Sequence, residues 1–371
     1  MVINLLKSRP TSINMTNTNN HYIPYLDGLR GFAILFVILS HMGLDKIVPG
    51  GFGVSLFFFI SGYLITKLLI AEYDKTGDIG FKNFYLRRVF RLYPALIVMV
   101  CLSIITLVIL HGKILPGAIL SAFFYFTNYY IVYFKPLPVK EWDYIFDPTW
   151  SLSIEEHFYL VFPVLFYLLY NKKNTFLIFL IIASVIPLIY RCYLTYNAAT
   201  INEVFENRIY VTTETRADSI IWGCIAALIL FKYHSAAYIK ILKSKWSLIA
   251  GLLVILFSLL FRSAMFRESL RFTLQAIAFF LIVPAIGFYN PTSIIKRILE
   301  NKLMLFLGRL SYSLYLFHWM IIILANNNFK QYSMSWIIFI VFFSFLLSVI
   351  SYYFVEQPFI ALRKKFGSHA K

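Results

Sequence analysis

Charged residues are scarce in this chain. Only 14% of its 371 residues are Asp, Glu, Lys or Arg, whereas 60% carry hydrophobic side chains and the mean hydropathy is +0.74. This composition is too apolar for a soluble globular fold, so we expect an integral membrane protein. Cysteine is scarce too, because only Cys101, Cys192 and Cys224 occur, in or beside apolar stretches and without metal-site spacing. We therefore predict no structural disulfide and no zinc or other metal site.

The chain also lacks internal repeats of about 20 to 50 residues, a large soluble module and an obvious inverted pair of half-sequences. We therefore expect one membrane domain, residues 25–360, between a polar tail, residues 1–24, and a basic tail, residues 361–371. The first tail has no apolar segment that ends in a small-residue cleavage site, which predicts that the first span is kept as an anchor and that no signal peptide is removed.

Eleven apolar stretches approach the roughly 20 residues that a bilayer crossing needs. The stretch 114–134 is broken by Pro116 and rich in Asn and Tyr, so we expect an outer-face or re-entrant element there. The prediction is thus an all-α, polytopic membrane protein with about ten transmembrane helices and both termini cytoplasmic. Lys140 would lie outside and Lys172 inside. The positive-inside rule assigns the loops dense in Lys and Arg to the cytoplasm: 71–93, 171–174, 232–245, 290–302 and 363–365.

The net charge of +17 then faces the cytosol almost entirely. Orientation in the membrane and contact with anionic membrane lipid explain most of this charge, so the composition requires no nucleic-acid partner.

Three ionisable residues lie in the first span. Arg30 and His41 are eleven residues apart, which is three helical turns, so they share one face about 16 Å apart along the axis, and Asp27 lies one turn below Arg30. Charges in lipid cost several kcal/mol unless they face a protein interior or a wet cavity. A functional site competes here with a charge pair at the helix end and a packed histidine.

The second span, residues 51–66, places small residues among large aromatic ones. Small residues allow two helix backbones to approach closely in a membrane. Plain helix packing is therefore one interpretation, and a smooth wall of a ligand channel is the other.

A compact arginine cluster follows in the segment 81–94. Arg91 lies one helical turn from both Arg87 and Arg88. Guanidinium groups bind phosphate oxygens in a bidentate manner, which suits a phosphate-bearing cytosolic cosubstrate. An interfacial helix that only binds lipid head groups has the same composition, and the sequence does not separate the two.

Two adjacent carboxylates, Glu155 and Glu156, open the span 148–163. Ser153 and Glu156 have the spacing of a capping box, which would explain one carboxylate. It leaves Glu155, His157 and Trp150 unexplained. A carboxylate here could hold an imidazole in its useful tautomer or act as a base itself.

Further polar residues enter later spans. Asp218, close to Arg216, is explained by helix capping, and the segment from Leu307 carries His318 about 22 Å above Leu303, close to the height of His41. We expect two imidazoles and the carboxylate pair to converge near the outer third of the bilayer.

Five segments together resemble the membrane acyltransferase family 3, which comprises integral-membrane acyl-CoA O-acyltransferases. They occur in the family's order: residues 26–41, 53–65, 87–94, 150–159 and 307–319. The arginine and histidine signature of the family falls on Arg30 and His41, its arginine motif on Arg87, Arg88 and Arg91, and its glutamate motif on Glu155 and Glu156. His157 replaces the more usual glutamine. We expect neither the extra span nor the secreted hydrolase-like domain of some members after Lys371, so acceptor selection would rest on the membrane domain or a partner.

The resemblance implies transfer of a short acyl group, with acetyl expected, from cytosolic acetyl-CoA or another acyl-CoA to a hydroxyl of a cell-surface or exported glycan. The cytoplasmic (inner) membrane is the expected location, and glycan-assembly proteins are candidate partners. Arg87, Arg88 and Arg91 would bind the CoA phosphates. His41 would act as general base or carry the acyl group covalently, with Glu155 or Glu156 near it. Asp27 and Arg30 complete the expected catalytic group, and the expected acceptor-side or supporting residues are Trp150, Ser153, Tyr159, Arg216, Asp218 and His318.

Two rival functions fit the composition. A secondary transporter or flippase for an anionic solute would also bury charge in a ten-span bundle, but it is favoured by broken helices at matching positions of two halves, and the sequence shows none. A non-catalytic membrane scaffold leaves the paired histidines unexplained.

Overall fold

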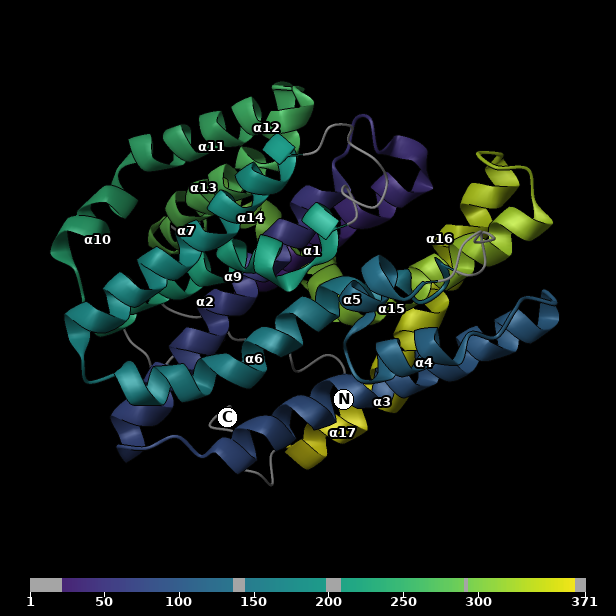
Figure 1. Cartoon of the computed structure of the whole chain (residues 1–371), viewed down its shortest axis with the longest axis horizontal. Helices are drawn as coiled ribbons and strands as arrows, with labels where there is room; N and C mark the ends of the chain where they lie inside the picture. The colour runs from purple at the N-terminus through teal and green to yellow at the C-terminus, as the bar shows by residue number, and fades with distance from the viewer. Residues whose placement is uncertain (1–21, 136–143, 198–207, 290–292, 364–371) are drawn as a thin grey trace.

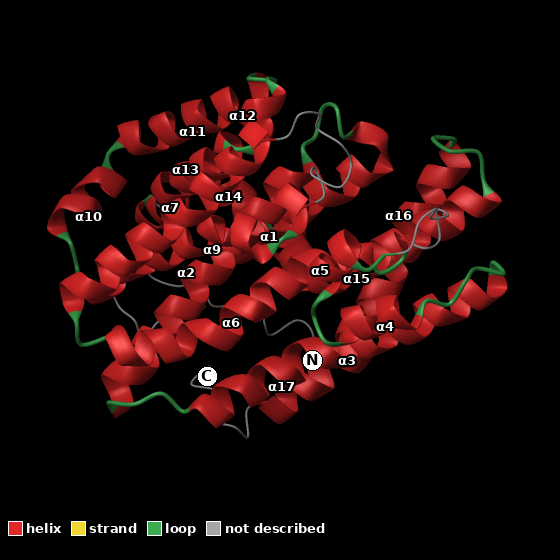
Figure 2. Ribbon diagram, viewed as in Figure 1, coloured by secondary structure: helices red, strands yellow, loops and turns green. Residues whose placement is uncertain are grey.

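Every regular element that the computed structural model describes is a helix (Figure 2). The described residues are 22–135, 144–197, 208–289 and 293–363. The predicted all-α fold class is therefore confirmed over these ranges. Lys140 and most of the two predicted tails lie outside them.

Within these ranges, eight helical segments are long and apolar enough to cross a membrane, so the chain is a multi-pass membrane protein. In Figure 1 the long helices lie roughly alongside one another, with α10 (Ala236–Lys243) and α11 (Lys245–Leu260) at one edge and α3 and α17 at the opposite edge. The eight segments are α1 (Pro24–Leu39) with η2 (Ser40–Leu44), α2 (Gly50–Thr76), α3 (Phe81–Ile109), η4 (Asp147–Thr149) with α6 (Trp150–Leu169), α7 (Lys173–Asn197), α13 (Leu270–Phe288), α15 (Lys302–Asn328), and α16 (Met334–Ile350) with η6 (Ser351–Glu356) and α17 (Gln357–Arg363).

Two further apolar segments lie where the sequence predicts crossings, so the described residues hold eight helices long enough to cross, or nine if a bent pair counts as one span, against about ten predicted. The first is α9 (Thr213–Ala227) with η5 (Leu228–Lys232), which bends by 111° into α10. The second is α11, which has 16 residues and is shorter than the roughly 20 that a perpendicular crossing needs. Within the described residues, α9 with η5 and α10 form the one sharply bent pair of apolar helices, whereas a transporter is favoured by broken helices at matching positions of two halves. His234 takes a positive φ of 47°, which ends one helix, and the Ser235 side chain caps the next.

The stretch 114–134 forms two short helices rather than one span. These are α4 (Pro116–Phe123) and α5 (Thr127–Tyr133), which have 8 and 7 residues. Tyr125, with a positive φ of 55°, separates them. Each helix is only about 10 to 12 Å long, so neither crosses a bilayer, in agreement with the sequence-based prediction.

Close helix contacts at glycine set the positions of α1 and α15. A Cβ atom on Gly308 of α15 would lie 1.9 Å from the carbonyl oxygen of Asp27 in α1, so only glycine allows this approach. Gly62 of α2 meets the carbonyl oxygen of Ile220 in α9 in the same way, at 2.0 Å. Helix packing therefore explains the inner part of the second span, whereas Gly50 and Gly51 at its start line a cavity.

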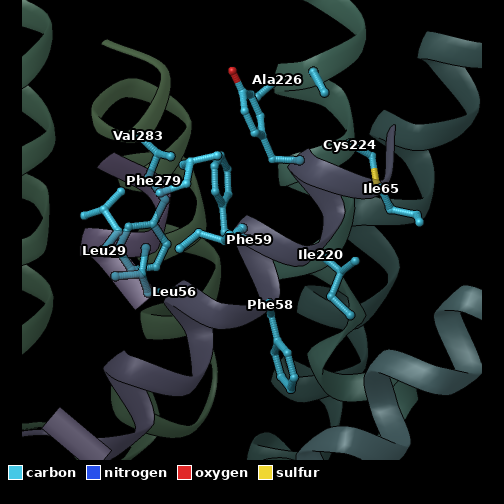
Figure 3. Packing of buried hydrophobic residues seen from close by; sticks show 14 of the residues in the cluster. Leu29, Leu56, Phe58, Phe59, Ile65, Ile220, Cys224, Ala226, Phe279 and Val283 are labelled. Carbon is cyan, nitrogen blue, oxygen red and sulfur yellow. The ribbon is translucent and has the colours of Figure 1, made fainter. Parts of the chain in front are cut away.

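The apolar core forms around α2, which passes between α9 and α13 (Figure 3). Phe59 of α2 points toward Phe279 of α13, with ring centroids 6.0 Å apart. Phe58 points to the other side, where its ring meets the indole of Trp150 edge-on. The core thus fixes the start of α6 against α2, next to the site described below.

Candidate active site

A widened helical turn at the end of α1 presents His41. The α-helix becomes π-helical over Ser40–Leu44, and Gly43 takes a positive φ of 90° that favours glycine. The turn brings Nδ1 of His41 to 2.8 Å from Nε2 of His318 in α15, with the two rings coplanar to within 2°. The edge of the Trp319 indole lies against the His41 ring, at 4.8 Å between centroids. The predicted approach of the two imidazoles is confirmed.

The hydrogen-bond partners of His318 define which nitrogen of each ring carries a proton. Nδ1 of His318 lies 2.8 Å from the carbonyl oxygen of Tyr315 and 3.0 Å from that of Leu314, and a carbonyl can only accept. In the neutral pair, Nδ1 of His318 is therefore the donor and its Nε2 is an acceptor. His41 must then donate from Nδ1, which leaves Nε2 of His41 as an unprotonated nitrogen.

His41 lines a cavity of about 170 Å³, called here the histidine cavity. His318 is fully buried, whereas His41 is solvent-exposed. The cavity lies where several helices begin or end, and Trp150 is part of its wall as expected for an acceptor-side residue. Its other lining residues are Val37, Ser40, Gly50, Gly51, Val54, Tyr144, Asp147, Pro148, Tyr210, Tyr315 and Trp319.

A second and larger cavity, of about 1,100 Å³, contains the arginine cluster and is called here the arginine cavity. Arg88 stacks on the ring of Tyr159 with its guanidinium carbon 4.0 Å from the ring centroid, and Arg87 forms a salt bridge to Glu72 at 2.9 Å. Because the cluster lines a cavity, it is more than a lipid-facing anchor. Seven cationic side chains line this cavity in total: Arg30, Lys67, Lys75, Arg87, Arg88, Arg91 and Arg309.

The two cavities adjoin. Val54 and Tyr315 line both of them, and Ser151 lines the arginine cavity. The hydroxyl of Tyr315 donates to the carbonyl oxygen of Pro148 at 2.7 Å, so the 2.6 Å contact between Ser151 and Tyr315 is a hydrogen bond donated by Ser151. Tyr315, held by Ser151 from the side of the arginine cavity, is thus part of the partition between the cavities, together with Val54.

The carboxylates do not lie beside His41, which corrects their predicted convergence with the imidazoles. Glu155 accepts hydrogen bonds from Ser61 and Tyr159, both at 3.0 Å, and both carboxylates line the arginine cavity. The reason is helix geometry, because α6 begins at Trp150 and Glu155 lies about 7.5 Å further along its axis. Asp27 and Arg30 also line the arginine cavity.

Two capping predictions are also wrong. Ser153 lies inside α6, whose N-cap position is Thr149, and its hydroxyl donates to the carbonyl oxygen of Thr149. It therefore cannot form a capping box with Glu156. Asp218 lies inside α9, whose N-cap position is Thr212.

Asp218 instead forms a fully buried salt bridge with Arg191 of α7, at 2.7 Å. Thr273 of α13 donates to the same carboxylate at 2.6 Å. Arg216, two residues before Asp218 in α9, donates to Ser55 and to the carbonyl oxygen of Tyr210, and its guanidinium carbon lies 3.9 Å from the centroid of the Phe272 ring. These contacts support the wall of the histidine cavity from behind, because Tyr210 belongs to that wall.

His157 is not among the residues that line either cavity. Its Nδ1 lies 2.8 Å from the Thr213 hydroxyl, and its ring stacks on Tyr129 of α5. Tyr129 donates to Glu214, and burial raises the pKa of Tyr129 to about 12, which keeps it protonated as a donor. The departure from glutamine at this position thus serves the packing of α5 against α6 and α9.

The sequence analysis missed several residues that the structure brings to the site. Lys67 and Glu356 line the arginine cavity although both are nearly buried, and Asp147 and Tyr144 line the histidine cavity. Lys67 could have been predicted as a site residue, because it is a charged residue within an apolar span. Asp147 begins the short helix η4, and no sequence pattern indicated it. Within the described ranges, no group of three or more His, Cys, Asp or Glu side chains is placed to hold a metal ion.

The fold and the site thus define a polytopic membrane protein with a hydrogen-bonded histidine pair at a small aromatic cavity, which adjoins a large cationic cavity. A family model described as an acyltransferase domain matches residues 23–353, and the chain belongs to this family.

Relatives share most of this chain. The O-acetyltransferase OatA of Staphylococcus aureus (strain NCTC 8325 / PS 47) is 31% identical over 362 residues, which cover 93% of this chain and 58% of OatA. The protein SACOL0978 of S. aureus (strain COL) is 33% identical over 361 residues, covering 91% of this chain and 57% of that protein. The chain therefore spans a little more than half the length of these relatives. No solved structure matches it.

Proposed function

We propose that this protein transfers an acyl group, in the simplest case acetyl, from acyl-CoA to a hydroxyl of a cell-surface or exported glycan. Membership of the acyltransferase family and similarity to an O-acetyltransferase support the reaction class. The geometry supplies the division of roles: the arginine cavity takes the donor, and the histidine cavity takes the acceptor.

The donor site rests on the size and charge of the arginine cavity. Its volume of about 1,100 Å³ and its seven cationic side chains suit a nucleotide with several phosphates. Arg87, Arg88 and Arg91 bind the phosphates. Glu155 and Glu156 line the same cavity, where a carboxylate accepts hydrogen bonds from the amide groups of the pantetheine arm. The thioester then reaches the partition at Tyr315 and Val54.

The single observation that carries the proposal is the oriented histidine pair. Because Nδ1 of His41 is held by His318, the Nε2 atom has a lone pair available to the acceptor hydroxyl. Nε2 removes the hydroxyl proton while the hydroxyl oxygen bonds to the thioester carbonyl carbon. The carbon–sulfur bond breaks, and the CoA thiolate takes the proton back from His41, which restores the neutral pair.

We further propose that the protein lies in the cytoplasmic (inner) membrane, with the donor-binding arginines on the cytosolic side. The basic loops that flank α2, α3 and α6 support this orientation through the positive-inside rule. An acyl group would then pass outward through the protein, from the arginine cavity across the partition to the acceptor.

The test uses the full chain purified in detergent, radiolabelled acetyl-CoA, and a membrane glycan fraction as acceptor. We expect release of CoA together with label in the glycan fraction, both lost in a His41→Ala variant. Comparing the masses of surface glycans from a deletion strain and its parent then identifies the acceptor. Uptake of an anionic solute into proteoliposomes, with no CoA release under any condition, would instead support a transporter and reject the proposal.

A further inference from the structure

We propose that Val54 and Tyr315 limit the length of the acyl group that this protein transfers, so that acetyl passes between the two cavities and longer chains such as butyryl do not. This inference rests on the proposed function and deepens it, because it assigns two residues that select the donor substrate. It is carried by the position of these side chains between the cavities and by the contacts that hold them.

The two cavities share part of their lining. Of the described residues, Val54 of α2 and Tyr315 of α15 alone line both the arginine cavity and the histidine cavity. Both are buried. A side chain that borders two cavities lies between them, so an acyl group that moves from one cavity to the other must pass these two residues.

Tyr315 is held at its hydroxyl and at its backbone. The hydroxyl donates to the carbonyl oxygen of Pro148 at 2.7 Å and accepts from Ser151 at 2.6 Å. The carbonyl oxygen of Tyr315 accepts from Nδ1 of His318 at 2.8 Å, and the rings of these two residues lie 5.8 Å apart between centroids. Moving the ring aside would leave buried hydrogen-bonding groups without partners, which is costly. The ring is therefore a fixed wall next to the histidine pair.

Val54 is held by the packing of α2. A Cβ atom on the preceding residue, Gly53, would lie 2.5 Å from the carbonyl oxygen of Ala33, so α2 lies against the backbone of α1 at this point. A valine side chain in a helix has one strongly preferred χ1 rotamer. The backbone of Val54 is thus fixed by its neighbour, and its side chain has little freedom to make way for a ligand.

The proposed reaction brings the acyl group to this point. The CoA sulfur stays on the side of the arginine cavity, and the acceptor hydroxyl approaches from the histidine cavity. The thioester carbonyl carbon must therefore bond to the hydroxyl oxygen close to Val54 and Tyr315, and the alkyl part of the acyl group lies beside these walls. Acetyl brings only a methyl group there, whereas one further methylene in an apolar site of fixed size changes kcat/KM by roughly 10- to 200-fold.

The experiment compares acetyl-, propionyl- and butyryl-CoA as donors for the full chain in detergent, with a membrane glycan fraction as acceptor and CoA release as the measurement. We expect kcat for butyryl-CoA to lie about 100-fold or more below that for acetyl-CoA, because two methylenes are added. The CoA part of both donors binds in the arginine cavity. Butyryl-CoA should therefore inhibit acetyl transfer competitively, with an inhibition constant within a few-fold of the KM for acetyl-CoA.

Val54→Ala tests the wall directly, because it removes two methyl groups beside the acyl chain. We expect the preference for acetyl-CoA over butyryl-CoA to fall by about tenfold or more. Val283→Ala is the matched control, since Val283 is a buried valine of α13 that lines neither cavity, and its preference should stay within twofold of the wild type.

Val54→Ile tests the opposite direction and serves also where Val54→Ala does not fold. It narrows the passage, so kcat for propionyl-CoA should fall several-fold more than kcat for acetyl-CoA. Equal use of acetyl- and butyryl-CoA by the wild type would overturn the inference. So would an unchanged acyl preference in either Val54 variant, or equal changes in Val54→Ala and Val283→Ala. Absence of CoA release from every acyl-CoA tested would instead reject the proposed function itself.

Discussion

Nδ1 of His41 lies 2.8 Å from Nε2 of His318, and the two imidazole rings share one plane to within 2°. His41 comes from a π-helical turn and His318 from the middle of a buried helix, 277 residues later. The backbone carbonyls that accept from His318 set the tautomers of both rings. The pair therefore gives the small cavity one directed basic nitrogen.

Replacing His41 by alanine should abolish acyl transfer and leave folding and membrane insertion intact. His41 supplies the general base of the proposed reaction, and such groups contribute roughly 100- to 10,000-fold to rate. CoA release by the purified variant measures the loss, and elution from a size-exclusion column checks the fold. Turnover within a few-fold of the wild type would remove His41 from the mechanism.

Replacing His318 by alanine should be milder, with a loss of roughly 10- to 100-fold, the size of effect found when the partner of a functional histidine is removed. His318 positions His41 and does not touch the acceptor. Without it, no acceptor holds the proton on Nδ1 of His41, and the imidazolium form of His41 loses its hydrogen-bond partner, so the pH dependence of kcat/KM should change shape. An unchanged pH profile with a lower rate would mean that His318 has only a packing role.

Arg88→Ala should weaken the affinity for acyl-CoA first, with a KM increase of about 10- to 100-fold, because a charged phosphate contact contributes roughly 1.5–3 kcal/mol. Arg88→Lys should restore only part of it, since an ammonium group lacks the planar fork of donors. Arg297→Ala is the matched control, because Arg297 is exposed on α14 (Ile294–Leu299) and lines neither cavity. If Arg88→Ala and Arg297→Ala bind acyl-CoA equally well, the phosphate site lies elsewhere.

Asp218→Asn should destabilise the protein by about 3–5 kcal/mol, because it leaves the charge of Arg191 buried without its partner. Arg191 also donates to backbone carbonyls of Ser269 and Thr215, so the loss should loosen α7, α9 and α13 together. Thermal unfolding in detergent measures the effect. The double variant Arg191→Met with Asp218→Leu should recover much of the stability. A single variant as stable as the wild type would show that the ion pair contributes little.

The orientation can be tested by cysteine labelling in a variant without native cysteines. Lys113, in the loop before α4, and Lys172, between α6 and α7, are both exposed. Because 114–134 is expected not to cross, a membrane-impermeant maleimide added outside should label Lys113→Cys and not Lys172→Cys. The reverse pattern would invert the whole orientation. Labelling of both positions from one face would mean that an even number of crossings separates them, and it would contradict the proposed route.

The sequence by itself determined the class of the molecule. Long apolar stretches can only be satisfied as helices in a membrane, where each backbone group must bond within its own segment. The same logic identified Asp27, Arg30, His41 and His318, because polar side chains inside such stretches are costly and stand out.

Only the tertiary structure decided which of these residues meet. The sequence placed the carboxylates with His41, but the first turn of α6 begins earlier than the capping pattern indicated, which moved Glu155 and Glu156 into the arginine cavity. The partner of Asp218 and the position of Asp147 in the wall of the histidine cavity could not be predicted from the sequence either. Contacts such as Arg191 with Asp218 join residues far apart in the chain, and they depend on how glycine-mediated approaches set the helix positions. The helical periodicity of the sequence predicts which residues share one face of a helix, whereas the packing of the helices decides which residues that face contacts.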